Sequence, residues 1–430
     1  MISDMLKPAK EGFVWTWLPD MTEPVVAGRI DLVNGLYQFT YGRSYLEREN
    51  AIPLYEPELP MRAGVYVPRA PHVIAGCLRD GAPDNWGRRV IYTRLMGRRD
   101  RDMDTDRIDE LSYMLLSGSD RTGALDFQES SSTYQPRLAE HATLEMMMAA
   151  ASHIDRGVQL PTELDEAIHH GTSIGGARPK VLLSDGDRKL IAKFSSSRDP
   201  HNIVGAEFIG MTLAHRVGIN VATVEMRQVA GKNVLLVDRF DRVRKPDGWA
   251  RRHMVSALTM MELDERSAHH GSYEDLAGIL RRRGSAPAAT LIELYRRMVF
   301  NILIGNTDDH ARNHAAFWDG RHLTLTPAYD LEPRPRMGRA ANQAIRVHRS
   351  SRESRIAVAL DAAPGFGITT DRAIDIAVMQ VETVQDAFNA IAAEAGITEI
   401  DRNILANRAI LNPYVFEGAP ARIARLERPL

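Results

Sequence analysis

The stretch GNTDDHARNH, residues 305–314, contains two aspartates, two asparagines, two histidines and an arginine directly after an apolar segment. Asp308 and Asn313 are five residues apart, which is the interval between the base and the metal-binding amide in the catalytic loop of protein kinases. A carboxylate at the first position can accept or orient a hydroxyl proton, and an amide oxygen at the second can bind magnesium. The spacing predicts a loop for phosphoryl transfer.

Two other interpretations of this stretch stay open. His310 and His314 are four residues apart and could bind a transition metal if the segment were helical. Gly305 and Asn306 favour a loop instead, and catalytic zinc sites use three protein ligands. A solvated turn would also be rich in Asn and Asp. Neither interpretation explains the other polar residues, which follow the order that a kinase needs.

Phosphoryl transfer also needs a lysine, a cradle for the phosphates and a second metal ligand. Lys193 ends the strand-like run KLIAKF, and Glu207 follows on a predicted helix, where it could form an ion pair with that lysine. Alone, Lys193 would be an edge-strand charge that reaches water. The loop GTSIGGARPK, 171–180, has flexible glycines but matches neither nucleotide-binding glycine motif. Asp330 ends the strand-like segment within HLTLTPAYDLEP, 322–333, and could be the second metal carboxylate.

The surrounding pattern predicts a β-rich part followed by an α-rich part. Strand-like runs occupy 13–18 and 35–42, and two apolar runs joined by Ser-Asp-Gly-Asp predict a hairpin over 181–194. Apolar residues at helical spacing predict helices over 288–304 and about 371–395. This order predicts an α+β protein.

Length and composition narrow the class of protein further. A chain of 430 residues predicts two or three domains, and the polar, serine-rich segment 128–137 is the best candidate for a boundary. The net charge of -2 gives no global basic field for nucleic acid. A single cysteine, Cys77, excludes an intramolecular disulfide and a cysteine-based zinc cage. The N-terminal residues lack an apolar signal region, and no apolar run approaches ~20 residues, so we expect a soluble, cytoplasmic protein without a membrane partner.

At the level of whole motifs, the sequence resembles the HipA family, which are serine/threonine kinase toxins of type II toxin–antitoxin modules. The motifs that carry the resemblance are TSIGGARPK (172–180), LIAKF (190–194), VDRFDR (237–242), FNILIGNTDDHARNH (300–314), LTPAYDLEP (325–333), DGAPDNWGRR (80–89) and GSDRTGALDF (118–127). The resemblance implies an α+β, protein-kinase-like, two-lobed core over 131–430, with a β-rich lobe and a mostly helical lobe. It also implies a small N-terminal β-containing subdomain over 1–130.

The resemblance implies a role for each matching position. Asp308 looks like the catalytic aspartate, Lys193 like a contact of the nucleotide phosphates, and Asn313 and Asp330 like the magnesium ligands. The remaining positions implied for ATP are Gly175, Gly176, Ala177, Arg178, Pro179 and Lys180 in a covering loop, Glu207 beside Lys193, Asp238, Arg239 and Phe240 in a hinge near adenine, His310, Ala311 and Arg312 at the phosphates, and Tyr329 beside Asp330.

Ser173 is the regulatory position that the resemblance implies. The family phosphorylates this serine on itself, which expels the loop and switches the enzyme off. The physics agrees, since about two added negative charges in a phosphate-binding loop repel the nucleotide. The sequence departs from better-known members at Gly-Gly-Ala-Arg-Pro-Lys (175–180) and at Asp309, which is glycine in some of them.

The function implied is an ATP- and Mg²⁺-dependent serine/threonine protein kinase toxin that causes growth arrest or persistence. Its partners would be a HipB-like helix-turn-helix antitoxin, operator DNA reached indirectly through that antitoxin, and a protein substrate such as glutamyl-tRNA synthetase. Two alternatives remain at this point: a small-molecule kinase of the aminoglycoside-phosphotransferase type, and a non-catalytic co-repressor that acts with a DNA-binding antitoxin.

Overall fold

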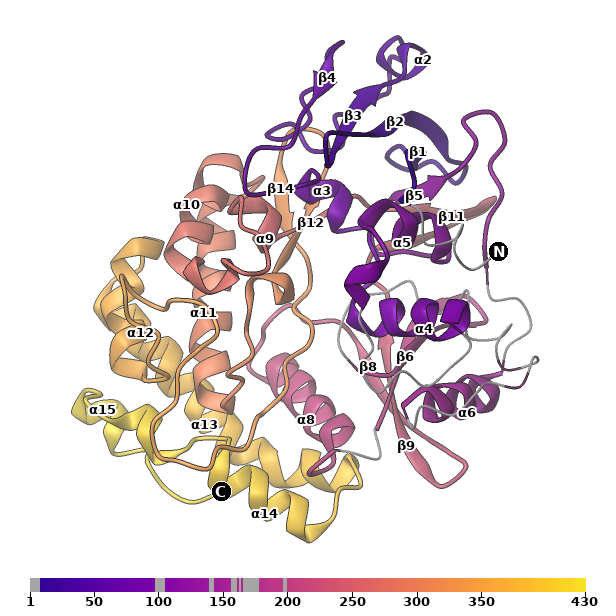
Figure 1. The fold of residues 1–430 in the computed structure, drawn as a ribbon. Helices are drawn as coiled ribbons and strands as arrows, with labels where there is room; N and C mark the ends of the chain where they lie inside the picture. The colour runs from indigo at the N-terminus through magenta and orange to yellow at the C-terminus, as the bar shows by residue number, and fades with distance from the viewer. Residues whose placement is uncertain are drawn as a thin grey trace. The chain divides into compact units, whose positions relative to one another are not determined.

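The computed structural model describes residues 8–96, 105–138, 143–155, 161, 164, 178–195 and 199–430 (Figure 1). The chain forms two compact units. Unit 1 consists of Met1–Arg198, Arg227–Val255 and Phe317–Arg321, and unit 2 of Asp199–Met226, Ser256–Ala316 and His322–Leu430. Most strands belong to unit 1 and most of the long helices to unit 2, so the predicted α+β class is confirmed.

The N-terminal part of unit 1 is a five-stranded antiparallel sheet in the order β4-β3-β2-β1-β5. Its strands are β1 (Glu11–Thr16), β2 (Val25–Val33), β3 (Leu36–Tyr41), β4 (Val65–Tyr66) and β5 (Leu125–Gln128). Asn34 and Gly35 join β2 to β3 with φ of 52° and 80°, as a two-residue type I′ hairpin turn requires. Alternate residues of β3 are buried, so one face of the sheet packs on the interior.

A second sheet in unit 1 has the order β6-β7-β9-β8. It contains the predicted hairpin, formed by β6 (Lys180–Asp185) and β7 (Arg188–Phe194), followed by β9 (Lys232–Asp238) and β8 (Val224–Val229), whose last three residues belong to unit 1. Helices α4 (Asn85–Met96) and α6 (Leu144–Asp155) pack on one face of this sheet (Figure 1). Their shared core includes Trp86, Val90, Met147, Ala151, Leu190, Ala192, Phe194 and Leu236.

Shorter elements complete unit 1. They are α2 (Arg43–Leu46), α3 (Gly76–Arg79), α5 (Glu110–Leu116), β10 (Arg242–Lys245) and β11 (Gly248–Arg251), while β12 (Met254–Ser256) and β13 (Ala315–Trp318) each run across a unit boundary. Asp84 caps α4, because its Oδ1 accepts a hydrogen bond of 2.8 Å from the N–H of Gly87.

Unit 2 is built around the long apolar helix α11 (Pro287–Ile304), against which α10 (Tyr273–Arg283), α12 (Ile356–Ala362) and α13 (Thr370–Glu394) pack (Figure 1). Helix α13 also packs on α8 (Ile203–Arg216). The unit further contains α9 (Ala257–Met260), β14 (Leu323–Leu325), α14 (Glu399–Arg408) and α15 (Ala421–Ala424). The helices predicted over 288–304 and 371–395 are thus present within one residue at each end.

The segment 128–137, expected to separate two domains, lies within unit 1. Arg137 donates through Nε to the carbonyl of Ser117 at 2.9 Å, which ties this segment to the region after α5. The division into residues 1–130 and 131–430 stays a prediction.

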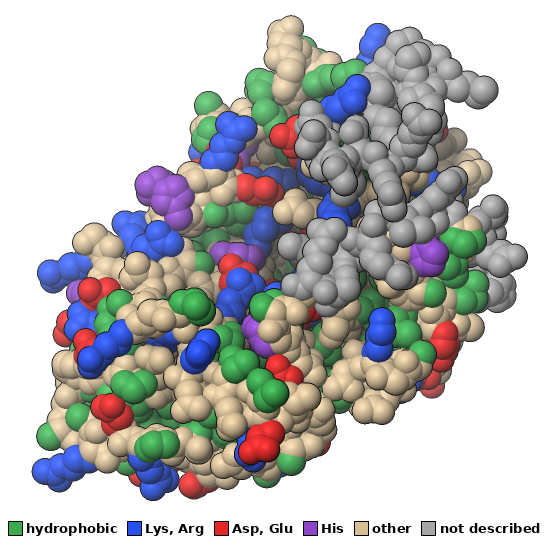
Figure 2. All heavy atoms as spheres, turned by 60° about the horizontal axis from the view of Figure 1, so that its bottom comes forward, with side chains coloured by type: hydrophobic (Ala, Val, Ile, Leu, Met, Phe, Trp, Pro, Cys, Tyr) green, Lys and Arg blue, Asp and Glu red, His purple; other side chains and the backbone are tan. Residues whose placement is uncertain are grey.

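Figure 2 shows acidic and basic side chains interspersed over the face that it presents. Among the helices of the described ranges, none is both long and apolar enough to cross a lipid bilayer.

Candidate active-site residues

Lys193 lies on an interior strand. Strand β7 has β6 on one side and β9 on the other, and Lys193 is paired in register with Lys180 and Leu235. The edge-strand interpretation of this lysine is therefore wrong. Its neighbours Ala192 and Phe194 point into the core under α4 and α6, so Lys193 projects from the opposite face of the sheet.

Lys180, the last residue of the glycine-bearing loop, is fixed to the start of α4. Its Nζ lies 3.3 Å from Oδ2 of Asp84, and both side chains are almost fully buried. Its carbonyl accepts a hydrogen bond of 3.0 Å from Nε1 of Trp86. The carbonyl of Pro179 accepts from the N–H of Phe194 at 3.1 Å, and Arg178 precedes it. Asp84 therefore both caps α4 and pairs with Lys180.

The other predicted residues of this loop lie outside the described residues. They are Ser173, Gly175, Gly176 and Ala177. Their assignments to ATP and to regulation stay predictions. The described part of the loop shows only that its C-terminal end is anchored at Lys180.

The predicted hinge follows β9. Asp238 is ion-paired with Arg188 at 2.8 Å, and the ring of Phe240 packs edge-on against Phe317 with centroids 5.9 Å apart. Arg239 is different, since its guanidinium is buried and pairs with Asp120 and Asp241 at 2.8 Å each. Any contact of Arg239 with a nucleotide would therefore use its backbone, because the side chain is committed to the interior.

This buried ion cluster also includes Arg242, which pairs with the same two aspartates at 2.8 Å. Burial opposes ionisation of Asp120, but Arg239 and Arg242 outweigh it, so the pKa of Asp120 lies below its usual range. Burial and the charge of Arg242 lower the pKa of Arg251 to about 9. The cluster fixes the segment after β9 to the loop that carries Asp120.

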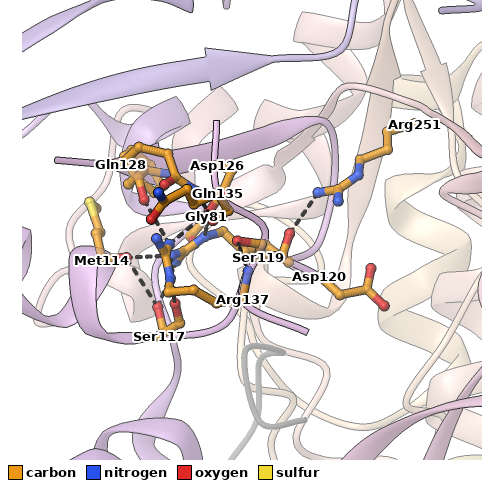
Figure 3. Close-up of polar contacts among 12 residues, drawn as sticks. Gly81, Met114, Ser117, Ser119, Asp120, Asp126, Gln128, Gln135, Arg137 and Arg251 are labelled. Carbon is orange, nitrogen blue, oxygen red and sulfur yellow. Dashed lines mark hydrogen bonds and ion pairs between the residues drawn. The ribbon is translucent and has the colours of Figure 1, made fainter. Parts of the chain in front are cut away.

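A second buried cluster lies beside it in unit 1 and contains the ion pair of Arg121 with Asp126. Figure 3 shows Asp126 together with Gly81, Met114 and Ser117, the other residues that contact this arginine. Arg121 donates to Asp126 at 2.8 Å and to the carbonyl of Gly81 at 3.0 Å. It also donates to the hydroxyl of Ser117 at 2.7 Å and to the carbonyl of Met114. Both charged side chains are fully buried, so every one of these contacts replaces water.

In unit 2, the loop 305–314 begins where α11 ends at a left-handed glycine. Gly305 has a φ of 67°, and an added Cβ would lie 2.6 Å from the carbonyl oxygen of Ala409. The carbonyl of Asp308 accepts hydrogen bonds from the N–H of His310 at 2.8 Å and from Nδ2 of Asn313 at 3.0 Å. The predicted pair of Asp308 and Asn313 is thus brought together by a direct contact.

The carboxylate of Asp308 meets an arginine that sequence reasoning missed. Nη2 of Arg334 lies 2.7 Å from Oδ2 of Asp308, and both side chains are 38% exposed. The same nitrogen lies 3.7 Å from Oε2 of Glu332. The carboxylate of Asp308 is therefore partly exposed to solvent and ion-paired with Arg334 at the same time.

Asp330 follows a short pairing of the chain with residues 220–222. The carbonyl of Asn220 accepts from the N–H of Ala328 at 2.8 Å. Tyr329 then donates its hydroxyl to the carbonyl of Arg312 at 2.7 Å, which links this segment to the catalytic-loop candidate. Asp330 itself has a φ of 59°, a conformation that non-glycine residues rarely adopt outside functional sites and turns.

Two oxygen-bearing side chains in unit 2 suit Mg²⁺. Nδ2 of Asn313 donates a hydrogen bond to the carbonyl of Asp308. The Oδ1 atom of Asn313 is therefore the one that could bind a cation. Asp330 supplies a carboxylate on a segment that Tyr329 ties to the same loop. This donor set of hard oxygens fits magnesium, which takes its other ligands from phosphates and water.

Among the described residues, no third ligand accompanies the two histidines of the loop. His310 precedes the 3-10 turn η3 (Ala311–Asn313), and His314 is buried with its ring against Tyr273 at 5.2 Å. Burial and the charge of Arg297 lower the pKa of His314 to about 3, so it is neutral. Within the part of the chain that the structure describes, no three His, Cys, Asp or Glu side chains cluster as metal ligands.

Helix α8 carries the predicted Glu207, which is buried, and the missed residue Gly210. A Cβ on Gly210 would lie 2.0 Å from the carbonyl oxygen of Leu331 and 3.0 Å from Cδ of Pro333. Only glycine allows the backbone after Asp330 to approach the helix this closely. Lys193 belongs to unit 1 and Glu207 to unit 2, so their ion pair stays a prediction.

Replacing Gly210 with alanine should lower the free energy of unfolding of unit 2 by about 1–3 kcal/mol, because backbone must move to admit the methyl group. The displacement would also move the backbone at Leu331, the residue after Asp330. Gly278→Ala is the matched control, since a Cβ there would meet only the Arg282 side chain at 3.4 Å. Thermal unfolding measures the difference, and equal stability of the two variants would contradict the close-approach argument.

The sequence is similar to known protein families and to known proteins. The HipA N-terminal domain family matches residues 21–128, and the HipA-like C-terminal domain family matches residues 172–394. An inferred kinase, Y4mE, of Sinorhizobium fredii is 28% identical over 320 residues, which cover 68% of this chain and 71% of that protein. The serine/threonine-protein kinase toxin HipA of Shewanella oneidensis is 27% identical over 244 residues, which cover 50% of this chain and 54% of the toxin.

A solved structure gives the fold independently. The complex of Shewanella oneidensis HipA, HipB and operator DNA contains a chain that matches with a TM-score of 0.67 and 19% identity, covering 96% of this chain and 97% of that chain. The likeness shows the fold, which is α+β and protein-kinase-like, with a β-rich lobe and a mostly helical lobe.

Proposed function

Because the chain belongs to the HipA family, we propose that it is an ATP- and Mg²⁺-dependent serine/threonine protein kinase. The observation that carries the proposal is the contact between Asn313 and Asp308, with Tyr329 tying the Asp330 segment to the same loop. These contacts support Asp308 as the base and Asn313 and Asp330 as two oxygen ligands on adjoining segments of unit 2. The proposal adds from unit 1 Lys193 on an interior strand and the loop that ends at Lys180.

In the proposed reaction, a serine or threonine hydroxyl oxygen attacks the γ-phosphorus of ATP. The bond from that phosphorus to the β–γ bridging oxygen breaks, ADP leaves, and the hydroxyl proton passes to the carboxylate of Asp308. Asn313 and Asp330 would hold Mg²⁺, which supplies neutralising charge to the phosphates. Lys193 would contact those phosphates, with Arg178–Lys180 at the covering loop and the backbone of 238–240 near adenine.

The arrangement of partners is also proposed. The Shewanella relative is named a serine/threonine-protein kinase toxin, and the matching structure contains an antitoxin and operator DNA. We therefore propose a HipB-like antitoxin as partner in the cytoplasm, with DNA reached through it. A protein such as an aminoacyl-tRNA synthetase would be the target, with growth arrest or persistence as the result.

Phosphate transfer from labelled ATP tests the kinase directly. The purified chain with ATP and Mg²⁺ should gain the mass of one phosphate, and Ser173→Ala should abolish that gain. No transfer to the chain itself or to any lysate protein would exclude the kinase. ATP consumption that labels no protein would instead favour a small-molecule kinase.

A further inference from the structure

A buried polar network lies behind the candidate catalytic loop, entirely within unit 2. Asp309, the residue after Asp308, is 1% exposed and accepts hydrogen bonds from the hydroxyl of Tyr273 at 2.6 Å and from the N–H of Ala344 at 2.9 Å. The oxygen of Tyr273 in turn accepts from Nδ2 of Asn301 at 3.0 Å. Helices α10 and α11 therefore hold Asp309 from the interior.

The same network holds the other flank of Asp308. Oδ1 of Asn301 accepts from Nδ2 of Asn306 at 3.0 Å, and the carbonyl of Asn306 accepts from Nε2 of Gln343 at 3.0 Å. The backbone is thus fixed at residues 306 and 309, so only Thr307 and Asp308 lie between the two anchors. Because this span is so short, the buried groups at residues 306 and 309 determine where the partly exposed carboxylate of Asp308 lies.

The charge of Asp309 decides whether this network is stable. Its donors are the hydroxyl of Tyr273, the side-chain amide of Gln343 and the N–H of Ala344, all of them neutral. Of the nearby cations, Arg297 on α11 pairs with Glu293, and Arg352 donates to the carbonyls of Gln343 and Ala344. His314, which packs on Tyr273, is neutral. An ionised Asp309 would therefore be a buried charge without a cation bonded to it among the described contacts.

Burial raises the pKa of the Asp309 carboxyl to about 7, although the hydrogen bonds from Tyr273, Gln343 and Ala344 oppose the shift. The folded chain consequently keeps this proton at pH values where the unfolded chain has lost it. The stability from this group is greatest below about pH 4 and declines until about pH 7, above which no more is lost. The pKa of Tyr273 is raised well above its ordinary range by burial and by Asp309, so its hydroxyl remains a donor.

We propose that Asp309 and Tyr273 are positioning residues for Asp308, and that they act while Asp309 is a neutral carboxyl. This inference rests on the proposed kinase function. It predicts a rate of phosphoryl transfer that falls as Asp309 ionises, for a reason separate from the chemistry of Asp308. A purely structural role for the network would leave the pH profile unchanged.

Asp309→Asn tests the charge state, because an asparagine can keep one oxygen for the Ala344 N–H and present an N–H to the Tyr273 oxygen. At saturating ATP, the wild-type rate should fall roughly tenfold between about pH 7 and pH 8.5, while the variant should change by less than about threefold. The melting temperature of the variant relative to wild type should rise between about pH 4 and pH 7 and change little at higher pH. Identical pH profiles for the two proteins would overturn the inference.

Tyr273→Phe tests the geometry by removing one oxygen. We expect a rate about tenfold lower at pH 6.5 with the KM for ATP unchanged within about twofold. The matched control is Tyr295→Phe, another fully buried tyrosine of unit 2, whose hydroxyl donates to the carbonyl of Ala359 at 3.0 Å. Equal rates for the two tyrosine variants would overturn the positioning role. If the wild-type protein transfers no phosphate at any pH, the proposed function itself is refuted. If phosphate transfer occurs but does not change in the Tyr273 and Asp309 variants, only this inference is refuted.

Discussion

Asp308→Asn should lower the rate of phosphoryl transfer by about 10²–10⁴-fold, because an amide cannot accept the hydroxyl proton that a positioned carboxylate takes. The side chain keeps its size, and its oxygen can still accept from Arg334, which pairs with Asp308 at 2.7 Å. Nucleotide affinity should therefore change by less than about threefold, so the loss falls on kcat. Initial rates with labelled ATP and nucleotide titrations measure the two quantities separately.

The matched control is Asp361→Asn, an exposed aspartate on α12 in the same unit. Its rate should equal that of the wild type. Full activity of Asp308→Asn would show that Asp308 is not the general base. Loss of nucleotide binding in parallel with the rate would show instead that this carboxylate contributes to ATP binding rather than to the chemical step.

Arg121→Met should lower the free energy of unfolding of unit 1 by about 3–5 kcal/mol, the cost of leaving one partner of a buried ion pair alone. The variant strips Asp126 of its closest cation and leaves the carbonyls of Gly81 and Met114 without this donor. Fluorescence can follow unit 1 selectively, since all five tryptophans of the chain lie in it. Denaturant unfolding monitored at these residues measures the loss.

Two companion variants sharpen this measurement. Arg43→Met removes a pair with Glu47 in which the arginine is 91% exposed, and should cost no more than about 0.5 kcal/mol. Adding Asp126→Leu to Arg121→Met should recover part of the loss, because the unpaired charge disappears with its partner. An unfolding midpoint for Arg121→Met equal to that of Arg43→Met would show that the buried pair contributes little.

The features that local patterns encode could be predicted from the sequence. The interval between Asp308 and Asn313, the hairpin of β6 and β7, and the apolar spacing of α11 each lie within one short segment, and the structure contains all three elements. The whole-chain resemblance gave the family and fold because motifs from both halves occur in one order.

Contacts between distant segments could not be predicted in the same way. Asp84 meets Lys180 across 96 positions, and Tyr273 meets Asp309 across 36. Neither pair has a spacing that a helix or a strand would impose. Gly210 carried no signal for a similar reason, since a glycine within an apolar helix is informative only when the backbone that touches it is known. Arg239 is the opposite case. Its motif predicted a segment near the nucleotide, but its side chain is buried in ion pairs with Asp120 and Asp241.

The interleaving of the two units along the chain has a consequence for synthesis on the ribosome. Unit 1 takes its last residues from Phe317–Arg321, and unit 2 takes segments from both before and after that stretch. Neither unit corresponds to one uninterrupted piece of the gene product, so neither can be complete in a nascent chain that ends before residue 317. Chains whose domains follow one another in sequence can fold one domain at a time during translation. This chain cannot complete either unit until late in its synthesis.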